Sequence, residues 1–203
     1  MVALRALRAT RFGSADQPFE LSRVAPFLSP GDAYLAVHGS DSDERTSTEN
    51  IAQITQPSGA KDDRSKYVRY ARAASLITQW RANGTLGTSE TPSLYVHKHT
   101  FERNGAKFTR TSLLGLIRVD APEVVLSEGV GFQDREDRLR MLEATRFHAD
   151  PIVAVGAHSP ATLSVLENLG TPLLQVTTES GETHELFAIA ETPVAFDRLL
   201  VIE

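Results

Sequence analysis

The sequence contains no cysteine among its 203 residues. This absence excludes disulfide bonds, thiolate catalysis and cysteine-ligated zinc, and it is compatible with a reducing compartment. Long apolar runs are missing too, and the N-terminal segment has arginines between its apolar residues instead of a continuous hydrophobic region. Neither a secretory signal peptide nor a membrane-spanning helix is expected, so the sequence predicts a cytoplasmic protein.

Positive charge is also scarce, with 21 lysines and arginines against 26 aspartates and glutamates and a formal net charge of −5. Nonspecific binding to nucleic acid depends on clustered basic residues, so the composition disfavours nucleic acid as a partner. Several common enzyme motifs are absent: the phosphate-binding P-loop, the glycine-rich dinucleotide turn, the nucleophile elbow and the His-Glu-x-x-His metal helix. The sequence therefore excludes the most easily recognised enzyme templates.

A polar stretch from residue 40 to residue 66 is rich in serine, aspartate, threonine and glycine. Such a composition predicts a long mobile loop with one apolar tether at Ile51 and Ile54. Its acidic residues lack the ligand spacing of a calcium loop, so a solvated loop is preferred over a metal site. The length of the chain and its 41% hydrophobic content suit one domain over residues 1–203.

Hydrophobic periodicity predicts the secondary structure. Residues 66–83 have apolar side chains at helical spacing, Gly84 follows as a helix stop, and Trp80 on the apolar face is expected in the core. Strands at 93–101 and 106–119 predict a hairpin. The other expected elements are strands at 2–8, 19–24, 33–38, 124–127 and 199–202, a central strand buried on both faces at 151–156, a helix from Pro160 to Asn168, and a second hairpin of 173–178 with 184–189. Together they predict the α+β class, with helices packed on a mixed, largely antiparallel sheet.

A charged helix is predicted to begin at Arg135, with Asp134 as its N-cap. Its apolar face is expected to contain Leu139, Met141, Leu142 and Thr145. Glu136 and Arg140 fall on the other side, in the favourable i,i+4 order.

Arg138 falls inside the apolar arc of this helix, where an unpaired guanidinium would be costly. Its expected partner is Glu128 in the preceding loop, Asp137, or an anionic ligand held by the guanidinium and the helix N-terminus together. An intramolecular ion pair is the preferred interpretation. Because Gly129 and Gly131 allow the backbone to approach a ligand closely, the loop is also a candidate anion site.

His97 and His99 are two residues apart on one predicted strand, so their side chains should lie on the same face. Paired histidines of this kind chelate a metal in some zinc and iron sites. No third ligand is evident in the sequence, so a polar strand face is the preferred interpretation and no metal site is predicted.

Two stretches of the sequence are distinctive enough to compare with known families. The first is Y-A-R-A-A-S-L-I-T-Q-W-R-A-N-G-T-L followed by P-S-L-Y-V, and the second is L-S-E-G followed by R-E-D-R-L-R-M-L-E-A-T-R. These stretches resemble the bacterial domain-of-unknown-function family numbered 1015 over about residues 64–156. The N-terminal V-A-L-R-A-L-R is similar more loosely.

The chain departs from the family pattern at three motifs. The usual loop His-Glu-Arg-Thr is matched here only by Glu128, and V-A-P-F-L-S-P replaces the usual Pro-Pro-Tyr-Asp. The family's later Asp-Gly-His-His-Arg segment, which resembles ParB-like nucleotide-binding domains and free-serine kinases, would begin about where this sequence ends. The chain is therefore expected to be the N-terminal part of a longer family architecture.

The resemblance implies that a small molecule, a nucleotide or another phosphorylated metabolite, is bound, with kinase-like phosphoryl transfer that requires Mg²⁺ and a nucleoside phosphate. The site residues it implies are Glu128 as catalytic base or metal-orienting carboxylate, Arg138, Gly129 and Gly131 for phosphate binding, and Asp137 and Ser127 in support. The altered motifs support an alternative equally well: a non-catalytic, degenerate member that acts as a structural or partner-binding domain.

Overall fold

A computed structural model describes residues 2–13, 49–55, 57, 63–65, 67–126, 132–149, 151–158, 160–178, 180–189 and 195–202. The chain divides into two compact units: unit 1 contains residues 1–9, 88–129 and 151–203, and unit 2 contains residues 10–87 and 130–150. The α+β class is confirmed, with four helices and three sheets in the described part of the chain. A single domain over residues 1–203 stays a prediction, and the strands expected at 19–24 and 33–38 lie outside the described residues.

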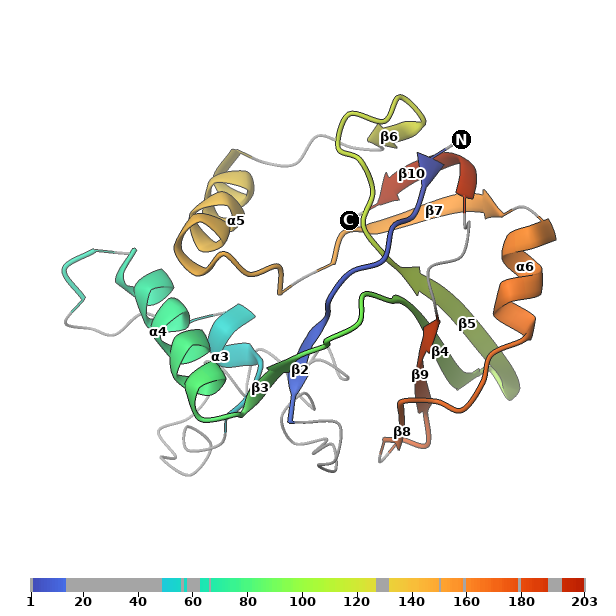
Figure 1. Cartoon of the computed structure of the whole chain (residues 1–203), viewed down its shortest axis with the longest axis horizontal. Helices are drawn as coiled ribbons and strands as arrows, with labels where there is room; N and C mark the ends of the chain where they lie inside the picture. Colours follow the sequence, from blue (N-terminus) through green and yellow to red (C-terminus); the bar gives the residue numbers. More distant parts are fainter. Residues whose placement is uncertain are drawn as a thin grey trace. The chain divides into compact units, whose positions relative to one another are not determined.

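Unit 1 contains an antiparallel sheet whose strands follow the order β5, β4, β9, β8 (Figure 1). Their bounds are Leu94–Arg103 for β4, Ala106–Leu114 for β5, Leu174–Thr177 for β8 and Thr183–Ile189 for β9. Both predicted hairpins are therefore confirmed. The turn between β4 and β5 is closed by Asn104 and Gly105, whose φ angles of 54° and 74° are those that a two-residue hairpin turn requires.

A second sheet of unit 1 is built around β10 (Ala195–Ile202), which pairs with three strands. β1 (Val2–Ala3) and β7 (Val153–His158) lie antiparallel to it, and β6 (Val124–Leu126) lies parallel. The prediction of a central strand at 151–156 was wrong. Within the described residues β7 pairs with β10 alone, and Val153 and Val155 are 53% and 57% exposed, so a continuous apolar run here forms a strand at the sheet edge.

The core of unit 1 joins the N-terminal segment to the antiparallel sheet and to α6 (Pro160–Glu167). Leu4 and Leu94 are its buried members, and Leu113, Val165 and Ile189 pack against them. Gly115 has no room for a side chain, because a Cβ there would lie 2.6 Å from Leu4 Cδ2 and 2.8 Å from Leu94 Cδ2. The first half of β4 is thus held firmly in place.

Unit 2 packs α4 (Val68–Ala82) against α5 (Phe132–Thr145) and α3 (Ala52–Thr55), with a small sheet of β2 (Thr10–Phe12) and β3 (Leu86–Thr88). The predicted helix at 66–83 is confirmed as α4, and Gly84 follows it with φ +82°. Trp80 lies in the core with Ile54 and Ile77, and Ile51 packs against it, which confirms the tether. No helix among the described residues has the length and apolar character needed to cross a membrane.

Candidate functional site

The site expected from the sequence lies mostly outside the described residues, which omit Ser127, Glu128, Gly129 and Gly131. α5 begins at Phe132 rather than Arg135, so Asp134 belongs to its first turn and is not an N-cap. Arg138 is exposed, and within the described residues it has no ion-pair partner. Its expected burial was therefore wrong. Of its three expected partners, Asp137 is bonded to Arg69 instead, Glu128 lies outside the described residues, and an anionic ligand stays a prediction.

The orientation of α5 explains this difference. The residues at i,i+4 spacing along its inner line are Asp137, Met141 and Thr145; Thr145 is buried and Met141 packs on the unit 2 core. Arg138 lies about 100° away from this line, as every residue does from its neighbour in a helix. Leu139 is turned further away and is 52% exposed. The predicted pair of Glu136 with Arg140 is confirmed, with 3.9 Å between Oε1 and Nε.

Asp137 instead joins α5 to α4 through Arg69 and Tyr70. Its Oδ1 accepts hydrogen bonds from the Arg69 guanidinium and from the Tyr70 hydroxyl, and Arg69 also donates to the Tyr70 oxygen at 2.9 Å. Burial, and then the bond to Asp137, raises the pKa of Tyr70, so the phenol stays protonated. Because the one carboxylate is balanced by the one guanidinium, this group is best explained as a fastening between the helices.

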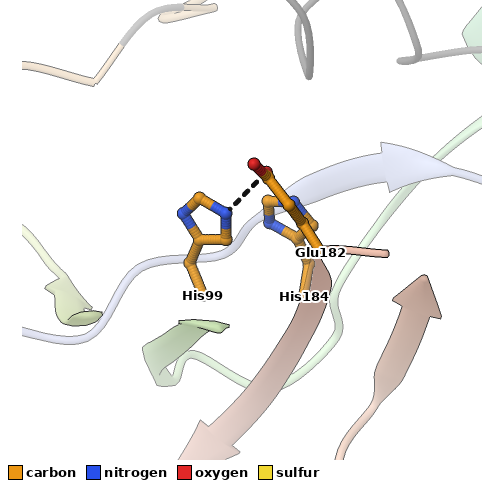
Figure 2. A group of neighbouring side chains, drawn as sticks. All are labelled: His99, Glu182 and His184. Atoms are coloured by element: carbon orange, nitrogen blue, oxygen red, sulfur yellow. Dashed lines mark hydrogen bonds and ion pairs between the residues drawn. The ribbon is translucent and has the colours of Figure 1, made fainter. Parts of the chain in front are cut away.

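Two histidines and a glutamate, His99, His184 and Glu182, meet on one face of the antiparallel sheet (Figure 2), and His97 lies next to His184. His97 and His99 are two residues apart on β4 and therefore share a face, and His99 is the direct cross-strand partner of His184 on β9. Glu182 comes just before β9, and its Oε2 lies 2.9 Å from His99 Nε2. One donor atom from each of His99, Glu182 and His184 lies within 4.8 Å of the other two. These three residues and His97 are termed the histidine cluster.

Arg110 on β5 determines which nitrogen of His99 carries the proton. A guanidinium has donors only, and one of its nitrogens lies 3.3 Å from His99 Nδ1, so Nδ1 must be the acceptor. The proton is then on Nε2, which donates to the Glu182 carboxylate. A neutral His99 satisfies both contacts in this tautomer.

His184 has a buried ring nitrogen, Nε2, with no hydrogen-bond partner among the described residues. Its other nitrogen, Nδ1, lies 3.1 Å from His97 Nε2. An unpaired buried N–H group is rarer and more costly than an unused lone pair, which favours the tautomer with Nδ1 protonated and donating to His97. His184 Nε2 then presents a free lone pair, the group that a metal ion binds.

The electrostatics of the cluster favour the uncharged form of His97 and His184. Burial lowers the pKa of His97, and the neighbouring His184, His99 and Arg110 lower it further. Burial also lowers the pKa of His184, followed by the effect of His99, while Glu182 acts in the opposite direction. Neutral imidazole is the form that ligates metals.

The ring planes limit what the cluster can do as it stands. The rings of His99 and His184 are stacked, with centroids 4.3 Å apart and planes 11° apart. A ring-nitrogen lone pair lies in the plane of its imidazole, so two stacked, nearly parallel rings cannot direct their lone pairs at one ion. Ligation of one ion by both rings would therefore require one of the two rings to turn out of this stack.

We expect acid to destabilise the protein through this cluster. Because His97 and His184 have lowered pKa values when folded, the unfolded chain takes up protons first as the pH falls below the ordinary histidine value of about 6.5. Their contribution is fully present above that pH and decreases below it. Urea unfolding at pH 7.5 and pH 5.5 checks this, and the decrease should be smaller in the variant H97Q/H184Q. An equal decrease in wild type and variant would assign the acid sensitivity to other groups.

The sequence identified only part of this cluster. His97 and His99 were recognised as a pair on one face, which is confirmed by their stacked rings with planes 6° apart. The third and fourth members were missed because 83 residues separate Glu182 from His99. The one available signal was His184 at the start of the second strand of the second predicted hairpin, and its relation to His99 depends on the pairing of β4 with β9.

Comparisons with known proteins give one match. A family model described as "Protein of unknown function (DUF1015)" matches residues 34–196, a range that includes the whole histidine cluster. No curated protein and no solved structure matches the chain.

Proposed function

We propose that this chain, which belongs to the DUF1015 family of proteins of unknown function, binds a divalent transition-metal ion. The ligands would be His99, Glu182 and His184. The observation that carries the proposal is the convergence of two imidazoles and a carboxylate, whose donor atoms lie within 4.8 Å of one another. The buried and unused Nε2 of His184 supports it independently.

The donor set indicates which ions would be bound. Imidazole nitrogen suits zinc, iron, cobalt and nickel, whereas magnesium and calcium prefer ligand sets made of oxygen. Two histidines and one carboxylate are the protein ligands of several catalytic zinc and non-haem iron sites, in which at least one coordination position stays open to water or substrate. A site of this kind therefore suits metal-assisted chemistry as well as simple storage of the ion.

His97 would act behind the ligand His184. Its Nε2 accepts the Nδ1 proton of His184, and a hydrogen bond of that kind fixes the tautomer and orientation of a metal-ligating imidazole. Loss of such a supporting partner typically weakens metal binding by about 10- to 100-fold. His97 is thus a positioning residue and not a ligand.

Calorimetric titration of the full chain with Zn²⁺ at pH 7.5 tests the proposal. We expect one ion per chain in the wild type and an affinity at least about 100-fold lower in H184Q and in E182Q, because each variant loses a ligand, while H97Q should lose about 10- to 100-fold. The matched control is H148Q, which removes an exposed histidine of unit 2 that has no part in the cluster. Circular dichroism would establish that every variant is folded.

Two results would contradict metal binding. One is the absence of saturable zinc binding by the wild type. The other is an equal affinity of H184Q, E182Q and H148Q, because zinc would then be held by surface groups elsewhere.

Nucleotide or phosphometabolite binding with kinase-like transfer stays a prediction, as does its alternative of a non-catalytic structural or partner-binding domain. The one observation in its favour is that the Arg138 guanidinium is exposed and, within the described residues, without an ion-pair partner. Titration with ATP, ADP or CTP and Mg²⁺ would distinguish nucleotide binding from the non-catalytic alternative, which predicts no binding. A nucleotide held by Arg138 should bind more weakly in R138A, and its binding should persist in H184Q. The cytoplasmic location also stays a prediction.

A further inference from the structure

We propose that the histidine cluster, when it holds a divalent ion, also binds a phosphate monoester, with the phosphate oxygens bridging the ion and the guanidinium of Arg110. The inference rests on the proposed metal binding and names the class of ligand that this site would take. Three features of the cluster support phosphate binding: its charge, the position of Arg110, and the hydrogen bond that Arg110 loses when a metal ligates His99.

The charge of the cluster is uncompensated once an ion is bound. Among the described residues, Glu182 is the one carboxylate that is hydrogen-bonded to a histidine of the cluster, and Arg110 is the one guanidinium. These two charges cancel, and the neutral imidazoles add none, so a divalent ion leaves a net charge of about +2 at a half-buried position. A ligand with two negative charges would restore neutrality.

Arg110 is placed to hold such a ligand. It is the direct cross-strand partner of His99 on β5, which puts its side chain on the same face of the sheet. It is exposed, and within the described residues its contact is the ring of His99 and no carboxylate. A planar guanidinium matches two phosphate oxygens at once, which an ammonium group does not.

Metal binding removes the acceptor that Arg110 uses. If the metal takes His99 Nδ1, the lone pair that accepts from Arg110 is consumed. If the metal takes Nε2, the proton of the neutral ring moves to Nδ1, which then faces the guanidinium as a second donor. With either nitrogen as the ligand, Arg110 loses its hydrogen-bond acceptor and lies beside a cation. An anionic oxygen can accept from Arg110 and also coordinate the metal ion.

The open coordination position provides the other contact. Three protein ligands leave at least one position of a tetrahedral ion free, and a phosphate oxygen can fill it. A phosphate monoester carries close to two negative charges at pH 7.5, since its second pKa is about 6. A carboxylate carries only one, so the charge of the cluster favours phosphate.

The test uses phenyl phosphate and benzoate, which share an aromatic ring and differ in their anionic group. The full chain is first titrated with Co²⁺ alone, and the cobalt-loaded protein is then titrated with each anion while the visible absorption of cobalt is followed. We expect saturable binding of phenyl phosphate, at least about tenfold tighter than benzoate. R110Q should weaken phenyl phosphate about tenfold or more, as the loss of a charged hydrogen bond does, and should bind Co²⁺ alone no more weakly than wild type.

The matched control is K107Q, which removes one positive charge from the same strand. Lys107 is exposed and lies three residues before Arg110 on β5, an odd spacing that places its side chain on the opposite face of the sheet. K107Q should therefore bind phenyl phosphate as the wild type does. Equal binding of benzoate and phenyl phosphate would overturn the assignment, as would equal losses in R110Q and K107Q. Failure of the protein to bind Co²⁺ would overturn the proposed function itself, whereas Co²⁺ binding without phenyl phosphate binding would overturn this inference alone.

Discussion

Replacing Trp80 with alanine is expected to lower the free energy of unfolding by about 3–5 kcal/mol, the usual cost of removing a large aromatic side chain from a core. Trp80 is 2% exposed and belongs to the core of unit 2 with Ile54, Ile77 and Leu86. Its ring also lies 5.5 Å from that of Phe12, at an angle of 54°. Truncation therefore leaves a cavity where α3, α4 and β3 meet, which neighbours on three separate elements cannot easily close.

Urea unfolding followed by circular dichroism measures this effect. Trp80 is the one tryptophan of the sequence, so fluorescence reports on unit 2 in the wild type but is lost in the variant. Gln79→Ala is the matched control, because it truncates the exposed neighbour on the same helix and alanine is an excellent helix former. Trp80→Phe should lose less than Trp80→Ala because it keeps an aromatic ring beside Phe12. A loss below about 1 kcal/mol in Trp80→Ala would contradict the burial described here.

Leu94→Ala is expected to cost about 2–5 kcal/mol, because Leu94 is fully buried between the N-terminal segment, β5, β9 and α6. The packing at this point is tight, as the lack of room for a side chain at Gly115 shows. Leu94 also begins β4 and pairs with Ile189 of β9. Since the same two strands carry His99 and His184, a looser start of β4 should weaken zinc binding as well as stability.

Leu173→Ala is the control for this second substitution, since Leu173 is 52% exposed and lies next to β8 of the same sheet. Its stability is expected to stay within about 0.5–1 kcal/mol of wild type. If Leu94→Ala and Leu173→Ala were equally stable, the unit 1 core would not be centred where the structure places it. If Leu94→Ala lost stability but kept full zinc affinity when folded, the histidine cluster would not depend on the packing beneath β4.

Local sequence signals were sufficient for most elements of the fold. The helical spacing that ends at Gly84 predicted α4, and the turn at Asn104 and Gly105 predicted the β4–β5 hairpin, because in each case the determining interactions lie within a few residues. The strand at 151–156 was misjudged for the opposite reason. A continuous apolar run can form either an edge strand or a central strand, so composition alone does not distinguish the two. The pairing with β10 determines which position this strand occupies.

The candidate site was harder to predict for the same physical reason. His97 and His99 could be placed on one face from strand alternation, but their partnership with Glu182 and His184 depends on the β4–β9 register, which pairs residues distant in the sequence. The burial of Arg138 was misjudged because helical periodicity gives the angles between side chains but not the direction from which α4 approaches. The line through Asp137, Met141 and Thr145 became evident only from the contacts of α5.

The position of β10 in its sheet bears on how the protein is made on the ribosome. β1, β6 and β7 all leave the ribosome before β10, yet in this sheet each of them pairs with β10. Until residues 195–202 emerge, the earlier three strands have exposed backbone donors and acceptors, which is the state most open to mispairing and to chaperone capture. The β4–β5 hairpin and the helices of unit 2 are synthesised well before β10, so nascent chains stalled before residue 195 should already contain them while this sheet is still incomplete.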